Sequence, residues 1–106
     1  DNGQKSNTVA IGFQAGKTIQ GINSVAIGYD AGGTRQSDYS IAIGNEAGLS
    51  NQAEKSIILN ANNSPLNCTT SGLFINPIRG RANSNLQMIA STLWYDTSNS
   101  EVCYHI

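Results

Sequence analysis

A repeat with a step of 16 residues restricts most strongly how this chain can fold. Four segments align without a gap, each with a small polar residue followed by a largely β-branched run: Thr8–Gly12, Ser24–Gly28, Ser40–Gly44 and Ser56–Asn60. Ala15, Ala31 and Ala47 keep the same step. Several columns in one register indicate an internal repeat, in which each unit is one small structural element that stacks on its neighbours.

Each unit is typical of a short strand, because β-branched residues two positions apart point to one face and the alanine between them points to the other. A unit of this size buries little alone, but stacked units bring like side chains into continuous columns. We therefore predict an all-β, parallel β-solenoid with 16-residue coils. We expect its interior to be formed by the β-branched and leucine columns: Val9, Ile11, Val25, Ile27, Ile41, Ile43, Ile57 and Leu59.

Two glycine columns predict turns at the same place in every coil, where φ is positive or another backbone approaches closely. They consist of Gly12, Gly28 and Gly44, and of Gly16, Gly32 and Gly48. The alanine column is expected to face away from the interior. Such a flat column suits contact with a neighbouring chain, or is a small residue at a crowded bend; it consists of Ala10, Ala26 and Ala42.

The pattern changes in the fourth unit, where Ile58 replaces the alanine and Asn60 the glycine. Terminal repeats are often atypical because they cap a stack, so we expect repeats over residues 1–64 and a separate β region over 65–106. Within that region we predict a strand at 72–79 and a hairpin at 93–104. A lone hairpin is marginally stable, and we expect packing or inter-chain contacts through Trp94, Tyr95 and Tyr104.

Composition excludes several classes of protein. Six Lys and Arg balance seven Asp and Glu, so no basic face for nucleic acid is indicated. No apolar run approaches the roughly 20 residues that span a bilayer. Cys68 and Cys103 lack the further ligands of a structural zinc site; they are either a disulfide or two small apolar side chains. We expect the chain to be part of a longer protein.

Catalytic patterns are not recognisable either. The one histidine, His105, lies next to the last residue, without a Ser/His/Asp arrangement around it. Asp30 and Glu46 share a repeat column that Gln14 interrupts, which indicates a solvated turn rather than a cation site. We therefore predict neither an enzyme nor a cofactor or metal.

The repeat resembles the head repeat of trimeric autotransporter adhesins, whose coils form a left-handed parallel β-roll. Asn23–Gly28 carries the motif, Asn7–Gly12 is a close copy, and Tyr39–Gly44 departs at its first residue. The resemblance covers about residues 6–64. It implies three chains packed side by side, that is, a homotrimer.

A second resemblance, to fibre-type proteins of large DNA viruses and phages, rests on Ser56–Ala61, Gly72–Arg79 and Leu93–Ser98. It implies a structural fibre or spike segment at a virion surface, involved in host attachment or virion architecture, with other virion proteins and a host receptor as further partners. Some of those proteins continue into a self-cleaving chaperone domain, which nothing in this chain matches.

Other functions stay open as alternatives. A bacterial adhesin head that binds host matrix or cells is one. An ice-binding solenoid would need a face of repeated threonines, whereas only Thr8 begins the Ser column. Acyltransferase solenoids use hexapeptides, and 16 is not a multiple of six. A ligand-binding module would use the loops where the coils differ most, namely 17–22, 33–38 and 49–54.

Overall fold

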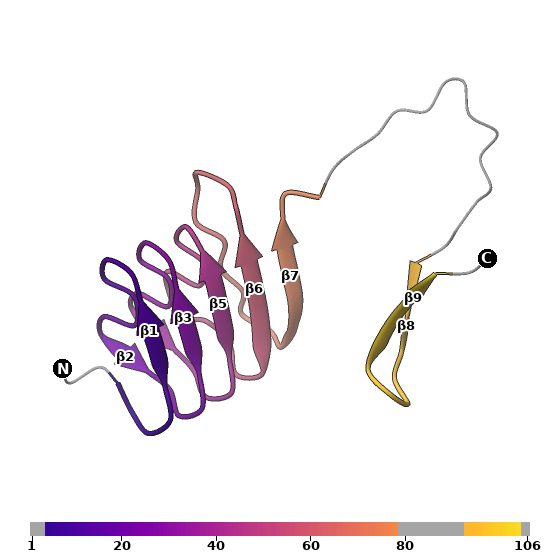
Figure 1. The fold of residues 1–106 in the computed structure, drawn as a ribbon, viewed down its shortest axis with the longest axis horizontal. Coiled ribbons are helices and arrows are strands. Elements are labelled where there is room, and N and C mark those ends of the chain that lie inside the picture. Colours follow the sequence, from indigo (N-terminus) through magenta and orange to yellow (C-terminus); the bar gives the residue numbers. More distant parts are fainter. Residues whose placement is uncertain (1–3, 79–92, 105–106) are drawn as a thin grey trace.

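The computed structural model describes residues 4–78 and 93–104, and the regular elements within these residues are all β-strands. The largest sheet has five parallel strands in the order β1 (Val9–Ile11), β3 (Val25–Ile27), β5 (Ile41–Gly44), β6 (Ser56–Asn60) and β7 (Gly72–Asn76). Figure 1 shows these strands side by side, each connected to the next by a loop that passes behind the sheet.

A second, smaller sheet lies on the return path of the coils. It pairs β2 (Ile19–Gln20) with β4 (Arg35–Gln36) in parallel, and isolated bridges extend it from Gln20 to Gln4 and from Gln36 to Gln52. In both sheets the paired residues are 16 positions apart, as in Val9 with Val25 and Ile19 with Arg35. The predicted all-β parallel solenoid with 16-residue coils is therefore confirmed.

The solenoid extends one coil beyond the repeats that align in sequence. β7 pairs in parallel with β6, with Ile57 opposite Leu73 and Leu59 opposite Ile75. The main sheet therefore continues across the expected boundary between residues 64 and 65. The sequence pattern hides this coil because its small-polar and alanine positions are occupied by Gly72 and Phe74.

The side of the strands that faces the interior is the opposite of the one we predicted. The alanine column points inward: Ala26, Ala42 and, in the same register, Ile58 are fully buried. The column residues predicted as the core are half-buried or exposed, with Ile11 at 59%. The prediction of Ala10, Ala26 and Ala42 as inter-chain contacts is wrong for the same reason, since two of them are sealed inside their own chain and Ala10 is half-buried beside them.

In the coils that carry an inward glutamine, the interior is too narrow for branched side chains because polar groups from the return path occupy it. Gln20, Gln36 and Gln52 are fully buried, and each donates from Nε2 to a strand carbonyl of its coil, at 2.7, 2.7 and 2.9 Å respectively. Ser24 and Ser40 are also buried and donate to backbone carbonyls three residues earlier, each at 2.6 Å. These bonds satisfy the buried side-chain donors, which would otherwise be costly to bury. Gln36 Oε1 and Gln52 Oε1 are buried without a hydrogen-bond partner among the described residues.

Both glycine columns have the positive φ expected of them. A Cβ on Gly12 would lie 2.7 Å from the carbonyl oxygen of Gly28 in the next coil, and one on Gly28 would lie 2.5 Å from that of Gly44. In the second column, a Cβ on Gly32 would lie 2.8 Å from Gln36 Oε1. The first column therefore allows coils to stack closely, whereas the second leaves space for the buried glutamine.

The predicted hairpin is present, formed by antiparallel β8 (Leu93–Asp96) and β9 (Glu101–Tyr104). Asp96 Oδ1 accepts hydrogen bonds from the hydroxyl and the backbone N–H of Ser98, at 2.6 and 2.9 Å. These two bonds stabilise the carboxylate form and lower the pKa of Asp96 below its ordinary value. The turn is thus held by a charged acceptor.

Candidate interaction surface

An apolar array covers the outward side of the five-stranded sheet. We call it the outer face; it consists of Val9, Ile11, Val25, Ile27, Ile41, Ile43, Ile57, Leu59, Leu73 and Ile75. Each strand contributes two side chains, roughly 7 Å apart along the strand, and neighbouring strands lie about 4.8 Å apart. The array is therefore two side chains wide and extends roughly 19 Å along the solenoid axis.

None of the outer-face side chains is buried by its own chain. Contiguous apolar surface of this kind marks an interaction site in soluble proteins. Full burial of a Val, Leu or Ile side chain stabilises by about 1.5–3 kcal/mol. Because these residues are already partly covered, burying the rest of each side chain against a partner stabilises by about 1 kcal/mol.

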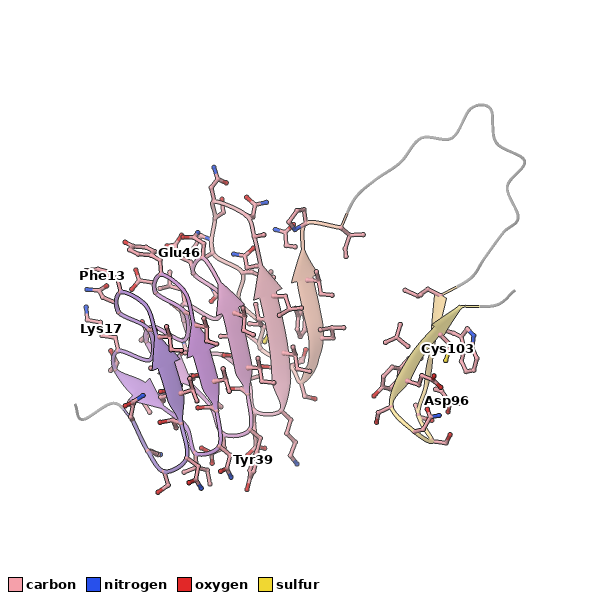
Figure 2. The ribbon with its side chains drawn as sticks, in the orientation of Figure 1. Phe13, Lys17, Tyr39, Glu46, Asp96 and Cys103 are labelled. Atoms are coloured by element: carbon pink, nitrogen blue, oxygen red, sulfur yellow. The ribbon has the colours of Figure 1, made fainter. Side chains whose placement is uncertain are left out.

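An aromatic pair lies at the turns that follow β1 and β3. The rings of Phe13 and Tyr29 stack with centroids 5.7 Å apart and planes 8° from parallel, and both remain more than half exposed. Figure 2 places Phe13 at the end of its coil, on the rim that also carries Glu46. We did not single out this pair from the sequence, although the two positions are 16 residues apart and both aromatic.

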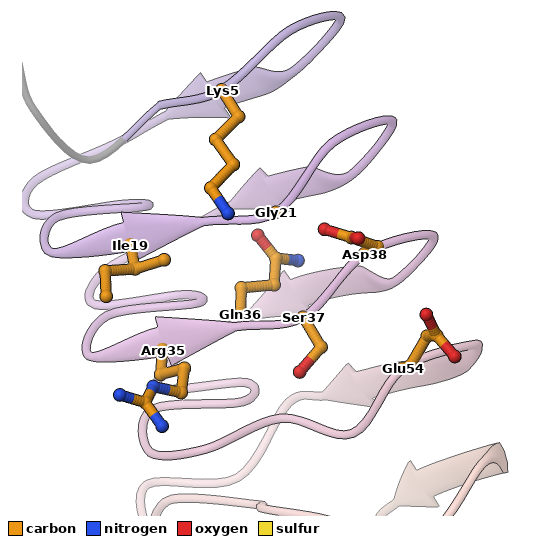
Figure 3. Close-up of a pocket in the computed structure, with 8 residues that line it drawn as sticks. All are labelled: Lys5, Ile19, Gly21, Arg35, Gln36, Ser37, Asp38 and Glu54. Carbon is orange, nitrogen blue, oxygen red and sulfur yellow. The ribbon is translucent and has the colours of Figure 1, made fainter.

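A shallow groove of about 400 Å³ crosses the return path of the first coils (Figure 3). Lys5 and Arg35 contribute positive charge to it, and Asp38 and Glu54 contribute negative charge. Asp38 Oδ1 accepts a hydrogen bond from the backbone N–H of Ile22 at 2.9 Å, so this carboxylate connects two coils. The groove therefore favours neither an anionic nor a cationic ligand.

The segments that a ligand-binding module would use belong to the fold itself. Residues 17–22 and 33–38 contain β2 and β4, and 49–54 contains the bridged Gln52. Their inward glutamines form a column with Gln4, whose Nε2 donates to Gln20 Oε1 at 3.1 Å. We did not predict this column from the sequence, although its four glutamines keep the 16-residue step.

Acidic side chains and cysteines form no site in the part of the chain that the structure describes. Asp30 and Glu46 occupy turn positions with φ of 52° and 51°, and the residues described hold no group of three potential metal ligands. Cys68 is buried in the roll and Cys103 lies in the hairpin, and both are free thiols. His105 and the side chain of Tyr104 lie outside the described residues, whereas Trp94 and Tyr95 are exposed on the hairpin.

A comparison with known protein families found a match within the coils. The YadA head domain repeat matches residues 20–32, in two copies. These residues contain the β3 motif together with the turns on either side of it. The coils are similar to YadA head repeats. The resemblance to trimeric autotransporter adhesins is thereby confirmed, and the YadA head repeat is a structural adhesin fold.

Proteins of the YadA head family are adhesins that are extracellular or exposed at a surface and that form homotrimers, which is consistent with self-association of this chain. Comparison with curated proteins found no match, and comparison with solved structures found none either. Within residues 4–78 and 93–104, no helix has the length and hydropathy needed to span a membrane.

Proposed function

We propose that this chain is a segment of a homotrimeric, adhesin-like surface fibre in which three rolls pack against one another through their outer faces. The observation that carries the proposal is the outer face itself. It is apolar in every coil, it runs the length of the stack, and no part of the described chain buries it.

The energy available from this face supports association. At about 1 kcal/mol for each partly covered side chain, the outer face offers roughly 10 kcal/mol per chain. Losing translational and rotational freedom costs about 4–15 kcal/mol on association. The two quantities are of similar size, and contacts from the aromatic pair and the hairpin add to the favourable side. A solenoid assembled in this way is a rigid rod that needs no chemistry of its own.

We infer that the fibre belongs to a virion and serves in host attachment or in virion architecture, in contact with other virion proteins and with a host receptor. The similarity of residues 56–61, 72–79 and 93–98 to viral and phage fibre proteins supports this assignment. The YadA repeat supports a second candidate, a bacterial adhesin head that binds host matrix or cells. An ice-binding role receives no support from a face of Val, Ile and Leu.

Sedimentation equilibrium of the 106-residue chain tests the association. We expect a mass of three chains, each of 11.2 kDa. Ile27→Asp introduces a charge on the outer face, and because Ile27 points away from the coil interior we expect a folded monomer with unchanged β-sheet circular dichroism.

Thr34→Asp is the matched control, since Thr34 is exposed on the return path rather than on the outer face. We expect this variant to remain trimeric. A wild-type chain that sediments as a monomer at micromolar concentration would refute the proposal. So would an Ile27→Asp variant that stays trimeric.

A further inference from the structure

One face of the hairpin is apolar and uncovered. Leu93 and Tyr95 are two positions apart in β8, and Val102 pairs with Tyr95 across the hairpin, so these three side chains share a face. Their exposed fractions are 70%, 56% and 56%. The opposite face carries the exposed Trp94, together with Asp96, Glu101 and the half-buried Cys103.

This face, together with Trp94, forms one wall of a cleft of about 820 Å³. The other wall is the C-terminal end of the outer face, with Ile57 and Leu73. Leu73 is 52% exposed, so the last coil of the stack leaves this wall open as well. Two apolar walls thus face one another in one chain without closing on each other.

We propose that each wall is completed by a neighbouring copy of this chain. The hairpin of one protomer packs its Leu93, Tyr95 and Val102 face on the Ile57 and Leu73 wall of the next protomer. The inference rests on the homotrimer proposed above and extends it, because it makes the hairpin a clasp between rolls rather than an appendage of its own roll.

Three observations favour contact between copies. The wall on the roll is continuous with the outer face, which brings a neighbouring chain to this position in the trimer. The 14 residues between Ile78 and Leu93 can extend at most about 50 Å, which is enough to reach an adjacent roll. A two-stranded hairpin is marginally stable alone and gains stability from a partner surface. Contacts that run from each copy to the next close into a ring of three.

Disulfide trapping in the full 106-residue chain separates this arrangement from the alternatives. Cys68→Ala and Cys103→Ser remove the native thiols, and Leu73→Cys with Val102→Cys places one thiol on each wall. Under mild oxidation we expect covalent trimers on a non-reducing gel, because the two thiols that meet belong to different chains.

The control keeps Cys103, which lies on the opposite face of the hairpin, and combines Cys68→Ala with Leu73→Cys alone. We expect no covalent trimer from it. A link within single chains would show that the hairpin closes on its own roll, and would overturn the inference. Absence of any link in a protein that still sediments as a trimer would overturn it too, and would leave the fibre proposal intact.

A second measurement does not depend on thiol geometry. Leu93→Ser with Val102→Ser removes apolar surface from the hairpin alone, so the roll keeps its β-sheet circular dichroism. We expect the protein concentration at half-dissociation of the trimer to rise about tenfold or more. An unchanged dissociation curve would contradict a clasp, whereas a wild-type monomer would instead remove the trimer on which the clasp depends.

Discussion

Gly28→Ala and Gly72→Ala form a pair that tests how closely the coils stack. Both glycines have φ of +128°, a conformation that side chains rarely adopt, so alanine strains the backbone equally at the two sites. Such strain costs about 1–3 kcal/mol. They differ in surroundings: a Cβ on Gly28 would lie 2.5 Å from the carbonyl oxygen of Gly44, whereas one on Gly72 would find its nearest atom at 3.9 Å.

The contact at Gly28 adds a second penalty, because the opposing atoms are backbone of the next coil and cannot rotate away. Overpacking of this kind costs about 1–3 kcal/mol more, so we expect a total loss of about 2–6 kcal/mol for Gly28→Ala. Gly72→Ala should lose only the strain. Urea unfolding followed by circular dichroism, at one fixed protein concentration, measures both losses. Equal losses would refute the close stacking of coils at this column.

Three further predictions concern the interior and the hairpin. Ala26→Leu should destabilise the roll by about 1–3 kcal/mol through overpacking, and Ile58→Ala in the same buried column by about 2–5 kcal/mol through a cavity, in the same unfolding assay. Gln36→Met keeps the shape but removes the donor to a strand carbonyl, so we expect a loss of about 1–3 kcal/mol; unchanged stability would mean that the bond adds nothing. Because the pKa of Asp96 in the folded hairpin is below its unfolded value, its contribution is present above the unfolded pKa and is lost as pH falls through the folded pKa. An NMR titration should show this lowered pKa, and Ser98→Ala should return it towards the ordinary value.

The 16-residue step was enough to predict the fold class, the strand positions and the turn glycines. It could not decide which side of the strands faces inward, since alternation defines two faces and treats them alike. We assigned the β-branched side to the interior because stacked columns of Val and Ile would form a continuous core. Ala26 and Gln36 show why this fails, because a coil with an inward glutamine has room inside only for a small side chain beside the amide. Ile58 is buried in the coil where Cys68 stands in place of the glutamine.

The sequence pointed to most residues of the outer face, but we assigned them to the wrong side of the strands. Ile27 and Ile43 were singled out as interior residues, yet the same residues now form the outer face. Contact with another chain was assigned to Ala26 and Ala42, which lie on the other side of the same strands. Sequence periodicity thus located the right strands. Only the packing of the return path shows which of their sides is left for a partner.

A structure of the assembled protein at side-chain resolution, by crystallography or cryo-electron microscopy, tests the central claim most directly. We predict three rolls whose outer faces meet around one axis, with Val25, Ile27 and their equivalents between chains and Ala26 enclosed within each coil. Outer faces exposed to solvent, with the rolls joined through the return-path sheet, would contradict the account.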